Sequence, residues 1–216
     1  MRLLLLLFLP ILAACRADPP RACEEIRFEE QPFTVCHFAA DDPGLALFHT
    51  HADGTPFADF DRLADSVAAD GGALIFAMNA GMYHEDRRPV GLYVENGAET
   101  QRLVTRAGPG NFGLLPNGVF WIDTLGTAHV TETLAYEAEA PEARFATQSG
   151  PMLVIGGQLH PEFNADGPSR KRRNGVGLSA DGRTLWFAIS DTPVNFHTFA
   201  RLFRDELGTP DALYLD

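Results

Sequence analysis

The sequence predicts a single α+β domain, in which a few helices pack on a largely antiparallel or mixed sheet. Three dipeptides, Asn96-Gly97, Asn117-Gly118 and Asp181-Gly182, are strong hairpin signals, and each lies between segments of strand-like composition. Two other segments carry apolar residues at steps of three and four, the spacing of an amphipathic helix. A chain of 216 residues with 45% hydrophobic residues suits one such domain with a substantial core.

The first predicted helix spans 56–70 and has its apolar residues on one face. The second spans 193–207, where Pro193 suits the first turn and Gly208 suits the C-terminal stop. A weaker helical or irregular piece is expected at 137–146.

Strands are expected on both sides of each hairpin turn and in four further apolar stretches. The turns join VGLYVE to ETQRLV, FGLLP to VFWID, and GVGLSA to RTLWFAIS. Because these turns are short, the strands that they join should pair antiparallel. The four further strands are expected at 73–78, 129–133, 152–155 and 212–215.

The N-terminus is typical of an exported lipoprotein. The apolar run from Leu3 to Ala14 is shorter than the roughly 20 residues that span a bilayer and has the proportions of a signal peptide. It ends in Leu-Ala-Ala-Cys, which resembles the bacterial lipobox, where the cysteine, here Cys15, is lipidated and becomes the first mature residue. The alternative is an ordinary signal peptide followed by an incidental cysteine.

The lipoprotein interpretation divides the chain into three parts. Residues 1–14 are a signal peptide, residues 15–25 a lipidated tether, and residues 26–216 the folded domain. The protein is then held on a membrane of the bacterial cell envelope by its lipid, facing the periplasm or the exterior.

The remaining two cysteines, Cys23 and Cys36, are expected to form a disulfide because an exported compartment permits one. Two free thiols are the alternative. The formal net charge is −12 and becomes −13 without the leader, which contains Arg2 and no acidic residue. Such an acidic protein is a poor candidate for nucleic-acid binding, which relies on Lys and Arg.

Metal binding has only weak support in the sequence. His49 and His51 would share one face of an extended segment, with Asp53 nearby, and could form the basis of a metal-dependent phosphodiesterase. A pair of exposed histidines before an Asp-Gly turn is the commoner outcome. We therefore predict no metal site and no cofactor; an acidic exported protein could hold a structural calcium ion, but no spaced loop motif marks one.

Five stretches follow one another along the chain: NAGMYHEDRRPVGLYVENG, GNFGLLPNGVFWI, SGPMLVIGG, SRKRRNGVGLSADGRTLWFAIS and ARLFRDELGTPDALYLD. In this order they resemble one family, the bacterial phosphodiester glycosidase domain. They cover about residues 73–216, and each is weak alone but the set is fairly specific. The family's final strand runs on into Asp-Gly-Gly or Asp-Gly-Ser, whereas this sequence stops at Asp216, so we expect it to be truncated.

The resemblance implies hydrolysis of a phosphodiester whose phosphate is attached to the anomeric carbon of a sugar. Such chemistry needs donors that hold the phosphate and a carboxylate that attacks the anomeric carbon or activates water. Asp216 is the first choice for the carboxylate, and Arg173, beside the basic run at 170–172, is the first choice for the phosphate. Asn79 completes the predicted catalytic set, because its amide supplies a donor and an acceptor at the end of the strand predicted at 73–78.

Five further residues are predicted to contact the sugar or the phosphate. They are polar groups at strand ends, together with a glycine that would let the backbone approach a ligand closely. Each has a structural alternative, such as a cap, a turn or a solvated loop. The predicted substrate-binding residues are Ser149, Asn174, Ser190, Gly81 and Asp191.

Two functions from different classes remain open from the sequence alone. One is an exported hydrolase of sugar-1-phosphodiesters whose partner is a sugar-phosphate or glycan substrate of the envelope. The other is a non-catalytic envelope lipoprotein that uses the same cleft to bind a glycan.

Overall fold

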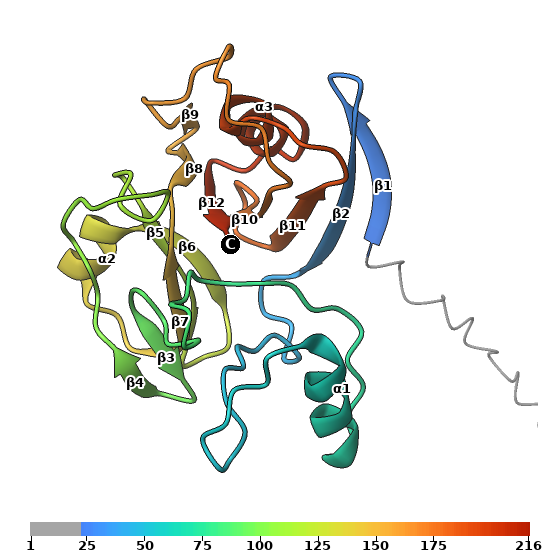
Figure 1. Ribbon diagram of the computed structural model, residues 1–216, viewed down its shortest axis with the longest axis vertical. Helices are drawn as coiled ribbons and strands as arrows, with labels where there is room; N and C mark the ends of the chain where they lie inside the picture. The colour runs from blue at the N-terminus through green and yellow to red at the C-terminus, as the bar shows by residue number, and fades with distance from the viewer. Residues whose placement is uncertain (1–22) are drawn as a thin grey trace, which may run out of the picture.

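In the computed structural model, which describes residues 23–216, the strands form two antiparallel sheets (Figure 1). The seven-stranded sheet has the order β1 (Cys23–Phe28), β2 (Gln31–Ala39), β11 (Thr184–Ser190), β10 (Asn174–Leu178), β12 (Asp211–Leu215), β8 (Met152–Ile155) and β9 (Gln158–Leu159). The five-stranded sheet has the order β4 (Ala98–Gln101), β3 (Tyr93–Glu95), β7 (Ala143–Ser149), β5 (Gly118–Asp123) and β6 (Ala128–Glu132).

Helices contribute little to the described residues. They are α1 (Phe60–Ala69), α2 (Thr133–Glu139), α3 (Phe196–Arg201) and a π-helical turn, η1 (Leu202–Glu206), that continues α3. The fold is therefore a single domain of two antiparallel sheets, closer to a mostly-β fold than to the balanced α+β fold that we predicted. Both predicted helices exist but begin later, because a side-chain cap stands at Asp59 and at Asn195, where each accepts a backbone N–H at 2.9 Å.

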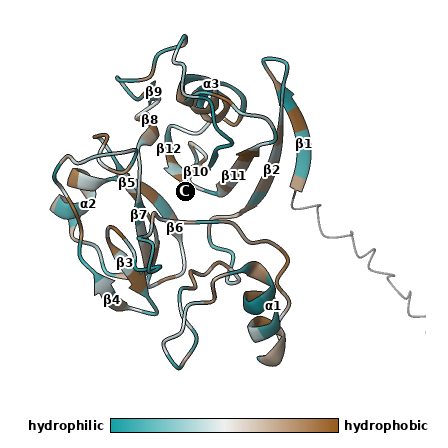
Figure 2. Ribbon diagram, in the orientation of Figure 1, coloured by the Kyte–Doolittle hydropathy of each residue, from teal (hydrophilic) through white to brown (hydrophobic). Residues whose placement is uncertain are grey.

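The two sheets pack face to face, and a helix covers the outer side of each. Apolar side chains of β5, β6, β10, β11 and β12 meet between the sheets and form one core. A second core lies between the seven-stranded sheet and α3–η1, and a third lies between the five-stranded sheet and α2. Figure 2 shows the hydrophobic colours on strands such as β3 and β11 and the hydrophilic colours in the loops near β9.

Strand β12 belongs to two of these cores because successive side chains of a strand point to opposite faces. Leu213 and Leu215 enter the core between the sheets, whereas Ala212 and Tyr214 face α3 and η1. The end of β12 therefore has an inter-sheet face and a helix face. Its neighbour β10 runs antiparallel to it, with Asn174 opposite Leu215.

Two predicted strands are wrong. Residues 73–78 form no strand; they cross extended between the sheets, and Phe76 and Met78 pack into the core there. The FGLLP segment is a turn, so Asn117-Gly118 is no hairpin. Asn117 is instead buried, donates its amide Nδ2 to the Phe112 carbonyl at 2.8 Å and accepts the Thr133 hydroxyl at 2.7 Å.

The helical piece predicted at 137–146 is displaced. Helix α2 ends at Glu139, and residues 143–149 form β7, which the sequence did not predict. The tether predicted at 15–25 also differs, because residues 23–25 already pair with β2 as the start of β1. Strands β1, β2 and β9 were not predicted either.

The predicted Cys23–Cys36 disulfide is confirmed and joins two directly opposed residues of β1 and β2. The signal peptide, the lipobox and Cys15 lie outside the described residues. Within residues 23–216 no helix is both long enough and apolar enough to cross a membrane.

The disulfide should stabilise the protein measurably. It closes a loop across 13 positions, and a cross-link over such a loop contributes about 2–4 kcal/mol to the free energy of unfolding. We expect dithiothreitol to lower the urea midpoint of the native chain. The Cys23→Ser/Cys36→Ser variant should start at the lower midpoint and not respond to dithiothreitol; an equal response would contradict the prediction.

Candidate active site

Residues 73–83, called the crossing segment below, are bound to the ends of β10 and β12. The side-chain amide of Asn174, at the start of β10, donates to the Asn79 carbonyl at 3.3 Å. The backbone N–H of Asp216, directly after β12, donates to the Ala80 carbonyl at 3.1 Å. Three predicted site residues, far apart in the sequence, are thus brought together by these two bonds.

Gly81 lies where the crossing segment meets β7. A Cβ atom at this position would stand 2.2 Å from the Thr147 hydroxyl oxygen and 2.7 Å from the Gln148 carbonyl oxygen. A side chain is therefore excluded by β7, which explains why the segment contains glycine here. The structure thus gives Gly81 a packing role, and its predicted approach to a ligand stays a prediction.

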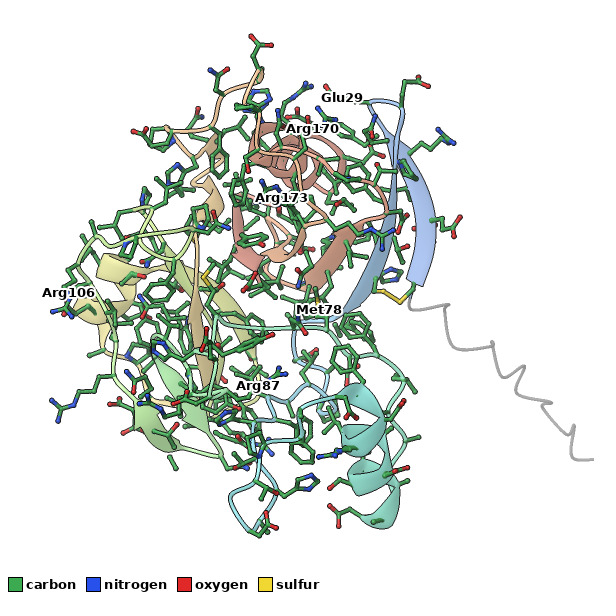
Figure 3. All side chains as sticks on the ribbon, in the orientation of Figure 1. Glu29, Met78, Arg87, Arg106, Arg170 and Arg173 are labelled. Carbon is green, nitrogen blue, oxygen red and sulfur yellow. A yellow bond between two sulfur atoms is a disulfide. The ribbon has the colours of Figure 1, made fainter. Side chains whose placement is uncertain are left out.

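Arg173 is the largest fully buried side chain of the described residues, with 1% of its surface exposed (Figure 3). Its Nε donates to the Val194 carbonyl and its Nη2 to the Ser169 carbonyl, both at 3.0 Å. The guanidinium carbon lies 3.5 Å from the centre of the Phe196 ring on α3. Burial lowers the pKa of Arg173, and the nearby Tyr214 partly opposes this effect.

The helix face of the sheet gathers three polar residues around Arg173. Ser190 and Arg173 exchange hydrogen bonds, because the Arg173 N–H donates to the Ser190 hydroxyl at 2.9 Å and the Ser190 N–H to the Arg173 carbonyl at 2.8 Å. Tyr214 lies on the neighbouring strand β12, opposite Gly175 of β10. The centre of its ring is 5.8 Å from the guanidinium carbon of Arg173. Its hydroxyl donates to the Asp216 carboxylate at 3.3 Å.

Tyr214 therefore links the guanidinium to the carboxylate. Burial, together with the negative charge of Asp216, raises the pKa of Tyr214 to about 12, so its hydroxyl keeps its proton at neutral pH. Asp216 itself is an exposed residue. A protonated donor beside the carboxylate suits a group that acts as a base or a nucleophile.

Ser149 is fully buried at the end of β7, and its hydroxyl has no hydrogen-bond partner among the described residues. Phe145 belongs to the core between the sheets, and the alternation of a strand places Thr147 and Ser149 on that same face. Two residues further on, the Pro151 carbonyl accepts the Tyr214 N–H at 3.1 Å. Ser149 thus lies at the junction of β7 with β12.

Asp191 is occupied elsewhere. Its carboxylate accepts the hydroxyl of Thr34 on β2 at 3.2 Å, and its N–H donates to the Pro32 carbonyl at 3.1 Å. Asp191 therefore ties the end of β11 to β2.

The basic residues at 170–172 are exposed, so of this run only Arg173 turns inward.

The histidine pair does not come together as a metal site. His49 Nε2 is 2.7 Å from the Arg87 carbonyl, and the His51 ring lies 4.0 Å from the Phe57 ring centre. Within residues 23–216 no group of three or more histidine, cysteine, aspartate or glutamate side chains could hold a metal ion.

Two residues of this site were missed by the sequence reasoning. Tyr214 could have been found, because it lies two positions before Asp216 and a strand places residues two apart on one face. Phe196 could not, because a phenylalanine on an apolar helix face gives no sign that it will cover a guanidinium.

Substituting Gly81 should destabilise the fold. We expect Gly81→Ala to lower the free energy of unfolding by about 1–3 kcal/mol, because the added methyl group must displace β7. The matched control is Gly108→Ala, where the nearest atom to the added Cβ is 3.9 Å away. Urea denaturation of both variants tests the expectation, and equal midpoints would contradict it.

Comparison with known proteins agrees with the resemblance carried by the five stretches. The family model for phosphodiester glycosidases matches residues 72–216. The uncharacterized protein YigE of Escherichia coli (strain K12) is 34% identical over 174 residues, which cover 80% of this chain and 66% of YigE. This chain therefore spans slightly less than two thirds of that relative.

Solved structures also resemble the chain. A hypothetical protein from Synechocystis shares its fold with a TM-score of 0.53 at 12% identity, over 90% of this chain and 55% of that one. The zebrafish N-acetylglucosamine-1-phosphodiester alpha-N-acetylglucosaminidase catalytic domain, auto-inhibited by its pro-peptide, matches with a TM-score of 0.49 at 15% identity, over 90% and 68% of the two chains. The resemblance drawn from the sequence is confirmed by the family model: the chain belongs to the phosphodiester glycosidase family.

Proposed function

We propose that this protein hydrolyses the bond between the anomeric carbon of a sugar and a phosphodiester. The observation that carries the proposal is the convergence of Asn79, Arg173, Asn174 and Asp216 in a chain that belongs to this family. These four residues come from three of the five stretches, and only the fold brings those stretches together.

Arg173 supports the choice of an anionic substrate. It is in no ion pair within residues 23–216, and its guanidinium nitrogens donate to the Val194 carbonyl and to the carbonyl and hydroxyl of Ser169, all of which are neutral. A buried charge is costly unless an opposite charge compensates it. A phosphate oxygen bound beside the guanidinium would supply that charge through a short, strong hydrogen bond.

The reaction divides its work among the neighbouring groups. Arg173 and the Asn174 amide hold the phosphate, which leaves as a stable anion and needs little help from an acid. Asp216 either attacks the anomeric carbon and forms a glycosyl ester that water then hydrolyses, or takes a proton from the water that attacks that carbon directly. The carbon–oxygen bond to phosphate breaks, and the oxygen departs with its electron pair on the phosphate.

A glycan-binding lipoprotein is the second candidate, and the burial of Arg173 favours it. Arg173 has 1% of its surface exposed, and its guanidinium donates to two backbone carbonyls. It therefore holds the loops at 169 and 194 together whether or not a substrate binds. In a protein that only binds a glycan, Arg173 would keep this structural role, and no catalytic carboxylate would be required.

Substitution of Asp216 separates the two candidates. The substrates are UDP-N-acetylglucosamine and a simple N-acetylglucosamine-1-phosphodiester, and the measurement is release of the free sugar. Asp216→Asn should lower kcat by roughly 10²–10⁴-fold, the usual contribution of a positioned base. The matched control Asp211→Asn, at the other end of β12, should keep activity near that of the native chain.

Arg173→Lys adds a second criterion, because a lysine keeps the charge and loses the planar geometry. We expect the KM for the phosphodiester to rise. The melting temperature of the variant is measured as a check that it folds. Sugar release that survives Asp216→Asn at the native rate would rule out the assigned carboxylate. Binding of the phosphodiester without any release by the native chain would favour the glycan-binding lipoprotein.

We also propose that the protein is exported and lipid-anchored in a bacterial envelope. The lipobox at Cys15 and a disulfide within the domain support this location. Cells that express the chain should incorporate labelled palmitate into it, and Cys15→Ser should abolish the incorporation while the disulfide still forms. Equal labelling of Cys15→Ser would contradict the anchor.

A further inference from the structure

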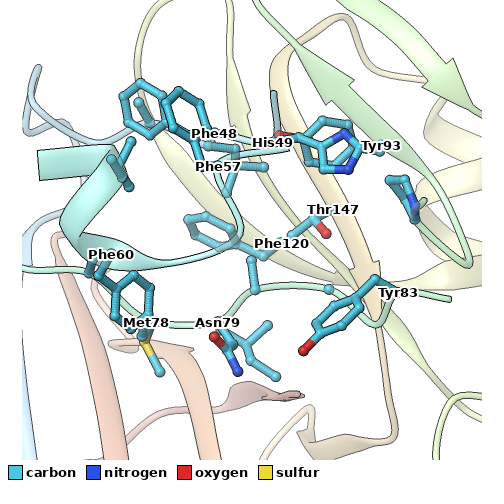
Figure 4. A pocket seen from close by; sticks show the side chains of 18 of the residues that line it. Phe48, His49, Phe57, Phe60, Met78, Asn79, Tyr83, Tyr93, Phe120 and Thr147 are labelled. Carbon is cyan, nitrogen blue, oxygen red and sulfur yellow. The ribbon is translucent and has the colours of Figure 1, made fainter. Parts of the chain in front are cut away.

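Figure 4 shows a cavity of about 540 Å³. It lies on the inter-sheet face of the strand ends, to which Leu215 points, and not on the helix face with Arg173. Its walls come from the segment at 44–49, from 56–63 at the start of α1, and from the crossing segment at 74–83. Residues of both sheets, including Phe120, Phe187 and Leu215, close its floor. This volume lies within the range of roughly 300–1,000 Å³ that is usual for sites that bind small molecules.

The lining is predominantly aromatic. The Phe48 and Phe57 rings meet edge to face at 6.2 Å, and the Phe76 and Phe187 rings lie 5.1 Å apart. Figure 4 shows Phe57 and Phe120 beside the open space and the polar groups of Asn79, Tyr83 and Thr147 around it. Such a lining binds an apolar group and offers few polar atoms to orient it.

Exposed apolar side chains gather at the cavity. Three of the seven large hydrophobic residues that are exposed within residues 23–216 line it: Phe48, Phe60 and Tyr83, each with 45–49% of its surface exposed. Arg87 also lines the cavity, with its guanidinium carbon 5.1 Å from the Tyr83 ring centre. The cavity thus has an apolar interior that reaches the surface through exposed aromatic side chains, with Arg87 at its lining.

The cavity borders the candidate active site at the strand ends, although Arg173, Asn174 and Asp216 do not line it. Asn79 and Gly81 line it, and the Asn79 carbonyl is bonded to Asn174 of the site. Leu215 forms part of its floor and directly precedes Asp216. A phosphate held at the strand ends would therefore carry its second ester group along the crossing segment toward the cavity.

We propose that this cavity binds the aglycone and that the aglycone is a lipid-like alcohol, an alkyl or isoprenoid chain esterified to the phosphate. The inference rests on the proposed function and adds its substrate class. The cavity takes the chain, the strand ends take the phosphate, and the sugar lies on the solvent side.

Binding of alkyl phosphates tests the assignment without any turnover. Methyl, butyl, hexyl and octyl phosphate, all below their micellar concentrations, are titrated into the full chain by calorimetry. We expect Kd to fall about fourfold for each methylene that enters the cavity, because burying a methylene contributes about 0.8 kcal/mol. Equal affinities for methyl and octyl phosphate would overturn the proposal.

The test variant is Phe60→Asp, which places a charge at the cavity on a residue that is already half exposed. An aspartate is also favourable in the first turn of α1, so the variant should fold. The matched control is Ile75→Asp, which changes a residue that is 80% exposed on the crossing segment and does not line the cavity. Phe60→Asp should remove the dependence of Kd on chain length, and Ile75→Asp should keep it; the same dependence in both would overturn the assignment.

Two further measurements separate this inference from its rivals. Light scattering on the same samples shows whether the native chain dimerises. A dimer that Phe60→Asp dissociates, together with a Kd for alkyl phosphates that does not depend on chain length, would identify a second copy as the occupant and overturn the proposal.

Sugar release from alkyl N-acetylglucosamine-1-phosphates isolates the proposed function. Tight octyl phosphate binding without release would sink the hydrolase and leave the apolar site standing; release at one rate for all chain lengths would keep the hydrolase and overturn the apolar aglycone.

Discussion

The site depends on the way the crossing segment is held between the two sheets. The Ala80 carbonyl accepts the Asp216 N–H, the Asn79 carbonyl accepts the Asn174 amide, and Gly81 lies against β7. These contacts join β7, β10 and β12 through a segment that has no strand partner of its own. These contacts hold Asn79 at the boundary between the polar site and the apolar cavity.

That boundary follows from the alternation of side chains along β12. Tyr214 faces α3 and links Arg173 to Asp216, whereas Leu215, one residue later, faces the opposite way and closes the cavity floor. One strand end therefore presents a charged surface and an apolar surface within two residues. A substrate with a phosphate and an apolar chain could use both without any further structural element.

Sequence reasoning succeeded where local signals agree with the fold. The β10–β11 hairpin follows from Asp181-Gly182 between two apolar runs, and β12 is itself a short apolar run. The β1–β2 hairpin was missed because β1 is exposed and charged, and its turn at Glu29 and Glu30 adopts positive φ without glycine or asparagine. The cavity could not be predicted at all, because segments with no common sequence signal meet there only through tertiary packing.

The burial of Arg173 is understandable only in the context of its surroundings. Its guanidinium is stacked on Phe196 and bonded to carbonyls, so the fold holds it in one orientation but leaves its charge uncompensated by any carboxylate within the described residues. A rigid buried cation stabilises an incoming anion without having to reorganise, whereas an exposed arginine must first lose its water and its freedom. The exposed residues at 170–172 lack this advantage, and for this reason we propose Arg173, the inward-facing member of the basic run, as the residue that holds phosphate.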